Sequence, residues 1–390
     1  MSIRRCLFGL AFFALAALCL SLSGDIAPRL QIVLAPAMQA SAAGPEPSAM
    51  SELSAGIAEL GSRLSAAYSE FLRTFEIGGE RLDLRLPFGQ NGERSGGYFD
   101  QEFFAAGRAE PEAAWRRIGE LLGSEDFLAY AEAMRAPGDK AVAFDLALGS
   151  WSVSADAELI GSLEANPSSG SNLIVNVLHR GSALSPAAVY DYLYCVARVG
   201  LDCAGFVYDI QKELARVLGA DLDALLAPSL GIEAGKVPVM IGLWFFDPEA
   251  GYVEVVGDEI ADLRPGDILL FRGHEGEFSH SAVVLSVDPV AGIIRYAQDT
   301  DWAPRPERGA HDSFILYDQK KPGLGLGDSS VAWLQRVRAA FGGEESPMWE
   351  NDGDRFRMEW AAGPNLVVRL AAVRDLVAAA YPGYYAQRAK

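Results

Sequence analysis

Apolar side chains recur at helical spacing in two stretches of the first half of the chain, residues 50–76 and Glu112 to Met134. Between them, the glycine-rich segment from Leu82 to Gly97 predicts turns. Residues 145–153 have the composition of a strand. The pattern therefore predicts a mainly helical region over residues 43–150.

A further helical pattern begins near residue 185. Ser185 and Pro186 are typical of a helix N-terminus, with serine as the N-cap and proline in the first turn. Downstream, Asp202 occupies another N-cap position, so Cys203 is predicted to lie in the first turn of the next helix. Gly219 is a natural stop for that helix. The apolar positions on one of its faces are Phe206, Val207, Ile210, Leu214, Val217 and Leu218.

Three short apolar runs follow this helix, and turns separate them, so the pattern predicts antiparallel strands. The runs are residues 268–271, 282–287 and 293–298. His280 opens the second strand, and Gln298 and Asp299 end the third, beside His280 in the predicted hairpin. Because successive side chains of a strand point to opposite faces, only one of Gln298 and Asp299 can face the imidazole.

The rest of the chain predicts flanking elements. Residues 329–341 show amphipathic helical spacing, and Phe356–Trp360 and Leu366–Leu370 are typical of strands that extend or flank the sheet. We interpret residues 326–390 as a C-terminal extension. His311 is placed in a turn before a further strand.

Residues 1–42 have the character of a targeting segment. Arg4 and Arg5 precede an apolar run from Cys6 to Leu20, and small residues follow it. We interpret the segment as a signal peptide; the alternative is an uncleaved N-terminal anchor, because the run approaches membrane-spanning length. Either form predicts that the body of the chain is exported, to the periplasm or outside the cell, with membrane contact only through this segment.

Composition and charge narrow the functional classes. Half of the residues are hydrophobic, so the chain can bury a core. Lys and Arg number 33 against 52 Asp and Glu, and the resulting net charge of −19 argues against a nucleic-acid partner. No repeated Cys/His spacing indicates a metal site, and Asp299 with Asp301 is too short a pair to specify calcium.

Outside the targeting segment only Cys195 and Cys203 remain, which is too few for a disulfide scaffold. We expect free thiols, since no obvious tight turn lies between them; a disulfide is the alternative. At Cys203, unpaired N–H groups and the positive end of the helix dipole predict a lowered thiol pKa and more thiolate. The other interpretation is a small buried hydrophobic residue. A histidine base downstream, His280, favours a nucleophile.

These residues resemble a known family. The string from Asp202 to Val207 (DCAGFV), the segment from Leu263 to Phe271 (LRPGDILLF) and His280 opening a strand resemble the NlpC-type cell-wall cysteine peptidases of the papain-like fold. The resemblance covers residues 185–320, less than half of the chain. It implies an α+β, papain-like core over residues 151–325, in which the nucleophile helix packs on an antiparallel sheet or half-barrel.

The resemblance also implies chemistry. Cys203 would be the nucleophile, His280 its base and Gln298 the residue that orients the base, with Asp299 as the alternative for this third role. The implied activity is cleavage of peptide or isopeptide bonds in the stem peptides of peptidoglycan, without a cofactor. Candidates near the oxyanion or substrate are Tyr190, Tyr192, Tyr194 and Asp202.

Several positions depart from the family pattern. Ala204 stands where serine is usual, and the third position is an amide or a carboxylate where histidine is commonest. The long separation of Cys203 from His280 implies an insertion between residues 225 and 259. Two alternatives therefore stay open. One is a non-catalytic module that binds cell-wall peptides, and the other is an amidase or acyltransferase on the same fold.

Overall fold

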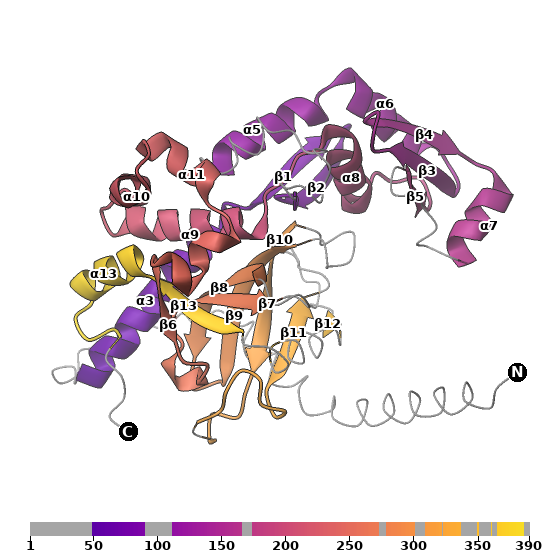
Figure 1. Cartoon of the computed structure of the whole chain (residues 1–390). Coiled ribbons are helices and arrows are strands. Elements are labelled where there is room, and N and C mark those ends of the chain that lie inside the picture. The colour runs from indigo at the N-terminus through magenta and orange to yellow at the C-terminus, as the bar shows by residue number, and fades with distance from the viewer. Residues whose placement is uncertain are drawn as a thin grey trace, which may run out of the picture. The chain divides into compact units, whose positions relative to one another are not determined.

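An eight-stranded antiparallel sheet is the largest element of the computed structural model (Figure 1). Its order is β12-β11-β10-β9-β8-β7-β13-β6. The strands are β6 (Val253–Val256), β7 (Ile268–Arg272), β8 (Phe278–Asp288), β9 (Ile293–Thr300), β10 (Gly309–Leu316), β11 (Ala332–Arg336), β12 (Trp349–Glu350) and β13 (Leu366–Leu370). The chain is thus a mixed α+β protein with antiparallel sheets, and the three predicted strands that follow the Cys203 helix are confirmed.

The structure describes residues 49–89, 111–165, 174–272, 278–300, 309–321, 323–336, 349–350, 360 and 365–385. The predicted targeting segment at residues 1–42 lies outside this range. Residues from Ala49 onward belong to one compact unit. Within the described ranges, no helix has both the length and the apolar character that crossing a bilayer requires.

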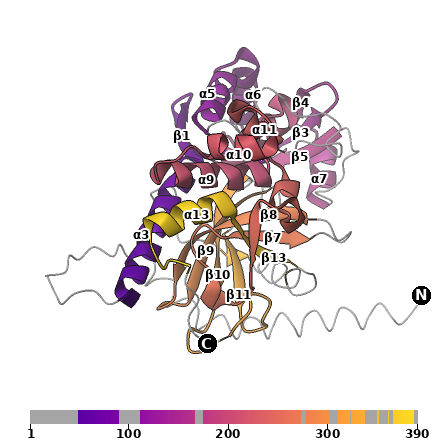
Figure 2. The same cartoon turned by 60° about the vertical axis from the view of Figure 1, so that its left-hand side comes forward.

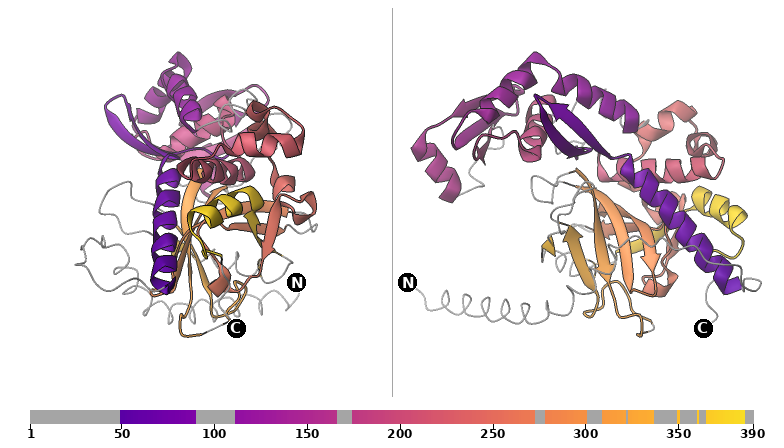
Figure 3. Two further views of the ribbon diagram at one scale, coloured as in Figure 1. Left: turned by 90° about the vertical axis from the view of Figure 1, so that its left-hand side faces the viewer. Right: turned by 180° about the vertical axis from the view of Figure 1, so that it is seen from behind.

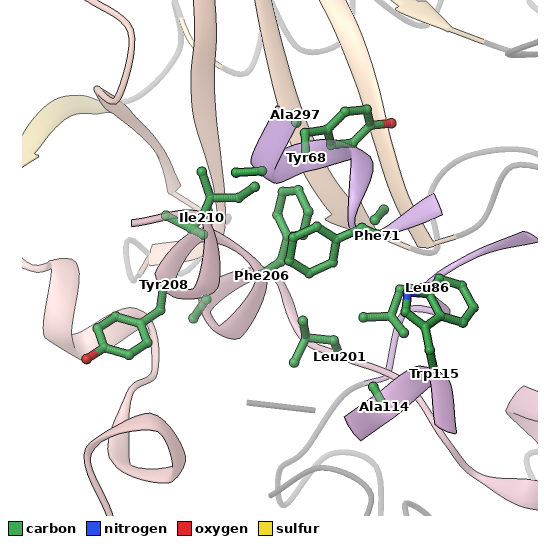
Figure 4. Close-up of a cluster of buried hydrophobic side chains, with 14 of the residues drawn as sticks. Tyr68, Phe71, Leu86, Ala114, Trp115, Leu201, Phe206, Tyr208, Ile210 and Ala297 are labelled. Carbon is green, nitrogen blue, oxygen red and sulfur yellow. The ribbon is translucent and has the colours of Figure 1, made fainter. Parts of the chain in front are cut away.

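Two helices cover one face of the sheet. Helix α3 (Ala49–Ser69) runs along β8, and α9 (Cys203–Val217) packs on β8 and β9 (Figure 3). Phe206 of α9 meets Tyr68 and Phe71 edge to face, with ring centroids 6.5 and 4.7 Å apart (Figure 4). Figure 2 shows α13 (Ala371–Ala380) beside α9. The apolar face predicted for the Cys203 helix is therefore buried, except at its C-terminal end, where Val217 and Leu218 are half-buried.

Side chains of β8 alternate between two cores. Val283 and Leu285 belong to the core shared with α3 and α9. Ala282 and Val284 belong to a second core, which contains Trp333. Because both faces of β8 are covered, its sequence is a continuous apolar run rather than an alternation of apolar and polar residues. Because both faces are buried, polar side chains of β8 can meet only those polar side chains of neighbouring strands that lie on the same face.

The predicted N-terminal helical region contains a hairpin, and here the prediction is wrong. Helix α3 ends at Ser69, and residues expected to continue it form β1 (Leu72–Ile77), paired with β2 (Glu80–Arg85). Gly78 and Gly79 connect the strands with φ values of 62° and 84°. Two successive positive φ angles suit the two-residue turn of a tightly twisted hairpin. These glycines therefore override the helical spacing of the apolar residues before them.

The second predicted helical block is divided. It forms α5 (Pro111–Leu122) and α6 (Glu125–Arg135), because the Ser124 side chain caps a new helix by accepting a hydrogen bond from the Phe127 N–H at 3.2 Å. The strand expected over residues 145–153 is confirmed in part: residues 150–153 belong to β4, but residues 146–149 form a turn that separates them from β3. The small sheet there has the order β4-β3-β5, with strands β3 (Lys140–Asp145), β4 (Ser150–Ser154) and β5 (Ile174–His179).

The C-terminal segment joins the large sheet. Strand β13 is confirmed and lies between β7 and β6. The helix predicted over residues 329–341 is wrong where the structure describes it, because Ala332–Arg336 is β11. Trp333 explains the difference: it is buried in the second core and donates its indole N–H to the Leu326 carbonyl at 3.0 Å. Residues 356–359 of the other predicted strand lie outside the described residues.

Short elements complete the chain, several of them between residues 225 and 259. They are α7 (Ala157–Ala165), α8 (Pro186–Tyr192), η3 (Leu193–Ala197), α10 (Leu222–Leu230), η4 (Ala234–Lys236), α11 (Val237–Met240), η5 (Leu243–Phe246), η6 (Pro248–Ala250) and η7 (Ile260–Asp262).

A buried ion pair connects β13 to the turn before β7, and we expect it to contribute to stability. Arg369 Nε lies 2.6 Å from Asp267 Oδ1, and the aspartate side chain is fully buried. Removing Arg369 leaves a carboxylate without its cation, so Arg369→Ala should lower the free energy of unfolding by about 3–5 kcal/mol. Urea titration followed by circular dichroism measures it.

The matched control is Arg374→Ala, which removes an ion pair between Arg374 and Glu254 that is a third to a half exposed. That loss should stay within about 1 kcal/mol. Equal destabilisation by the two variants would show that burial of the Asp267 pair contributes nothing.

Candidate active site

Cys203 is the first residue of α9. The preceding Asp202 has extended backbone angles, and its Oδ1 accepts a hydrogen bond from the Gly205 N–H at 2.7 Å. The predicted N-cap and helix start are therefore confirmed. The Cys203 side chain is only 7 % exposed, so the thiol lies beneath the protein surface. Cys195 is also buried, and neither cysteine forms a disulfide.

The electrostatics at the thiol differ from the expectation. Burial, the largest cause, and the carboxylates of Asp202 and Asp299 together raise the pKa of Cys203 to about 12. Polar groups of Ser281 lie against the sulfur and lower the pKa, without reversing the balance. The prediction of a lowered thiol pKa is wrong, because loss of hydration outweighs the helix dipole. At neutral pH the thiol is protonated.

His280 lies near the start of β8 and meets Gln298 of β9. Its Nε2 is 2.8 Å from Gln298 Oε1. Gln298 pairs with Ala282 in the strand register, so it shares a face with Ala282 and His280. Burial lowers the pKa of His280 to about 4, although the hydrogen bond to Gln298 raises it. Of the two candidates for the third role, Gln298 is therefore the one that contacts a neutral imidazole.

A third residue extends this pair. His311 Nε2 lies 3.1 Å from Gln298 Nε2, and His311 Nδ1 lies 2.8 Å from the Gly309 carbonyl oxygen. The turn expected at His311 is wrong, because the residue lies inside β10, directly opposite Gln298. Sequence reasoning missed this residue. The available signal was its alternation with Ser313 and Ile315 on one face of the predicted strand.

The thiol and the imidazole approach β8 from opposite faces. His280 and Gln298 lie on the face of the second core, whereas Ser281 and Asp299 lie on the face covered by α9, where Cys203 contacts Ser281. Adjacent residues of a regular strand point to opposite faces, and the pairing of β7 with β8 is regular through His280 and Ser281. The structure thus forms two polar groups, one around Cys203 and one around His280.

The candidate tyrosines belong to the N-terminal half. Tyr190 accepts a hydrogen bond from the Arg85 backbone N–H, and Tyr192 donates to Asp126 Oδ2 at 2.7 Å. Tyr194 is half-buried in η3 and packs against the main core. The hydroxyls of Tyr190 and Tyr192 therefore connect α8 to β2 and α6.

The segment after β2 hydrogen-bonds both to β10, which carries His311, and to the residues that lead into α9, which carries Cys203. The Leu86 carbonyl accepts a hydrogen bond from the Ala310 N–H at 3.0 Å, at the start of β10. The Gly89 N–H donates to the Leu201 carbonyl at 2.9 Å, and the Leu201 N–H donates to the Pro87 carbonyl at 2.8 Å. Leu201 lies two residues before Cys203. The segment after the N-terminal hairpin therefore stabilises the backbone beside both polar groups.

The remaining histidines lie elsewhere. His179 Nε2 is 3.0 Å from Asp191 Oδ2, and His274 lies outside the described residues. Among the side chains that the structure describes, no group of three His, Cys, Asp or Glu is arranged to hold a metal ion.

Comparisons with protein-family models, with curated proteins and with solved structures found no match.

The raised thiol pKa predicts slow alkylation of Cys203. With a pKa of about 12 in place of the ordinary 9.0, the thiolate population near neutral pH is lower by about a thousandfold. Iodoacetamide labelling, mapped by mass spectrometry of peptides, should be at least a hundredfold slower at Cys203 in the native chain than in urea, as an order-of-magnitude expectation.

The variant Asp202→Asn tests the cause. Asparagine caps a helix as well as aspartate does, so the variant removes a charge that raises the thiol pKa and keeps the helix start. Labelling should become faster, with unchanged circular dichroism. Rapid labelling of the unmodified native chain at pH 7 contradicts the raised pKa.

Proposed function

We propose that the chain is an exported thiol hydrolase that cleaves peptide or isopeptide bonds in the stem peptides of peptidoglycan. The observation that supports it best is the neutral imidazole of His280, held by Gln298 on the strand against which the Cys203 thiol packs. The substrate class rests on the resemblance to NlpC-type peptidases, and the papain-like core is part of the same proposal.

The chemistry starts from two neutral groups. Because the thiol is protonated and His280 is neutral, the imidazole takes the thiol proton as sulfur attacks the amide carbonyl. The Cys203 backbone N–H, at the start of α9, stabilises the oxyanion of the tetrahedral intermediate. The imidazolium then protonates the leaving amine, and water attacks the thioester to release the acid and restore the thiol.

Catalysis requires the His280 imidazole and the Cys203 thiol, which lie on opposite faces of β8, to come into contact. In the described conformation the ring and the sulfur approach the strand from opposite sides, so catalysis needs a change at the start of β8 that brings His280 to Cys203 while its Nε2 keeps the hydrogen bond to Gln298. This requirement, together with the raised thiol pKa, favours a second candidate function: a module that binds stem peptides without turnover.

Product analysis distinguishes the two functions. The native chain and the variant Cys203→Ala are incubated with purified peptidoglycan and soluble muropeptides, and the products are identified by mass spectrometry. A hydrolase yields a new amine and a new carboxylate only with the native thiol. Binding of muropeptides by both proteins without any product supports the binding module and overturns the hydrolase.

The pKa of His280 predicts the acid limb of activity. A protonated imidazole cannot accept the thiol proton, so activity is lost as pH falls through about 4 and is present above it. Initial rates of muropeptide cleavage between pH 3 and 9 measure the limb, with circular dichroism at each pH as the control for unfolding. An acid limb near the ordinary histidine pKa of about 6.5 contradicts a fully buried base.

A further inference from the structure

We propose that His311 is a positioning residue: it fixes the amide orientation of Gln298 and thereby decides which nitrogen of His280 carries the proton. The catalytic part of this role rests on the proposed hydrolase function. The assignment of protons within the network does not depend on that function.

The direction of hydrogen-bond donation along His280, Gln298 and His311 follows from the group at the end of this network, the Gly309 carbonyl. A backbone carbonyl oxygen can only accept, so His311 Nδ1, 2.8 Å from the Gly309 oxygen, is the nitrogen that carries hydrogen. In a neutral ring the other nitrogen, Nε2, then has the lone pair. The group 3.1 Å from this lone pair must donate, and it is the amide NH₂ of Gln298.

The same logic continues to His280. With its NH₂ turned to His311, Gln298 presents Oε1 to His280 Nε2 at 2.8 Å. An amide oxygen accepts, so His280 Nε2 carries hydrogen and Nδ1 keeps the lone pair. Nδ1 is therefore the nitrogen that gains a proton when the ring becomes an imidazolium. Without a fixed acceptor at His311, the amide has no such constraint on its orientation.

The surroundings keep the network neutral and in place. His280, Gln298 and His311 are 3 %, 0 % and 0 % exposed, and they come from three adjacent strands. Burial, with a smaller effect of the nearby Arg85 guanidinium, lowers the pKa of His311 to about 4, although the hydrogen bond to Gly309 opposes this. Both rings are therefore neutral at pH 7, as the proton assignment requires.

The carbonyl at the end of the network is fixed by backbone geometry. Gly309 has φ +100°, a conformation that side chains disfavour, and a Cβ there would lie 2.2 Å from the Leu86 carbonyl oxygen. The next residue, Ala310, donates its N–H to the same oxygen at 3.0 Å. Arg85 adds a hydrogen bond from Nη1 to the Ala310 carbonyl at 3.1 Å. The N-terminal hairpin therefore holds the group that sets the proton arrangement.

Nitrogen-15 NMR tests the assignment directly. The chain has four histidines, so a sample labelled at the imidazole nitrogens gives few signals, and single substitutions of His179, His274 and His280 assign all four. At pH 7 the native protein should show hydrogen on Nε2 of His280 and on Nδ1 of His311. Hydrogen on Nδ1 of His280 in the native protein overturns the proposal, and this measurement needs no variant at position 311.

Two variants separate positioning from structure. His311→Phe removes the acceptor, so the amide can reverse and His280 should show a mixed population with hydrogen on Nδ1. His311→Gln supplies a carbonyl oxygen where Nε2 was and should restore the native His280 pattern. A folded His311→Phe variant with an unchanged His280 pattern also overturns the proposal.

Activity adds a separate outcome. If the proposed hydrolase is correct, His311→Phe should lower kcat by about 10- to 100-fold with little change in KM, and His311→Gln should recover part of the loss. A native protein with the expected protons and no turnover removes the hydrolase function and leaves the positioning role standing. Native turnover with the wrong protons on His280 removes the positioning role alone.

Discussion

Burial of both faces of β8 and β9 is the constraint on which the rest of the site depends. Helices α3 and α9 cover one face, and the second core covers the other. Polar side chains on these strands are therefore removed from water and must find partners inside the protein. The hydrogen bonds from His280 through Gln298 and His311 to the Gly309 carbonyl meet that requirement. The same burial sets the protonation states, since it disfavours both thiolate and imidazolium.

The parts of the site that the sequence predicted are those with local signals. Asp202 is an N-cap whose partner lies three residues away, so the start of the Cys203 helix depends on a few neighbouring residues. The strands at residues 268–271 and 293–298 were visible as apolar runs between turns. The choice between Gln298 and Asp299 was not available from sequence, because it depends on register with a neighbouring strand.

The wrong predictions concern features that depend on residues distant in the sequence. Residues 332–336 and 72–77 carry spacing that fits a helix, and pairing with distant or hairpin partners made them strands. The prediction of a lowered thiol pKa was wrong for a similar reason. A helix N-terminus is a local feature that favours an anion, whereas the stronger effect, loss of hydration, comes from the strands and helices packed around Cys203.

The N-terminal hairpin acquires a role from these contacts. Residues 86–89 hydrogen-bond both to the start of β10 and to the segment that leads into Cys203. The backbones approach so closely that a Cβ on Gly200 would lie 2.3 Å from the Gly89 nitrogen, so only glycine fits at this crossing. A displacement of the hairpin would therefore move the Gly309 carbonyl and the start of α9 together. The two polar groups face opposite sides of β8, yet residues 86–89 hydrogen-bond to the backbone beside each of them, so one segment of the N-terminal region supports the whole candidate site.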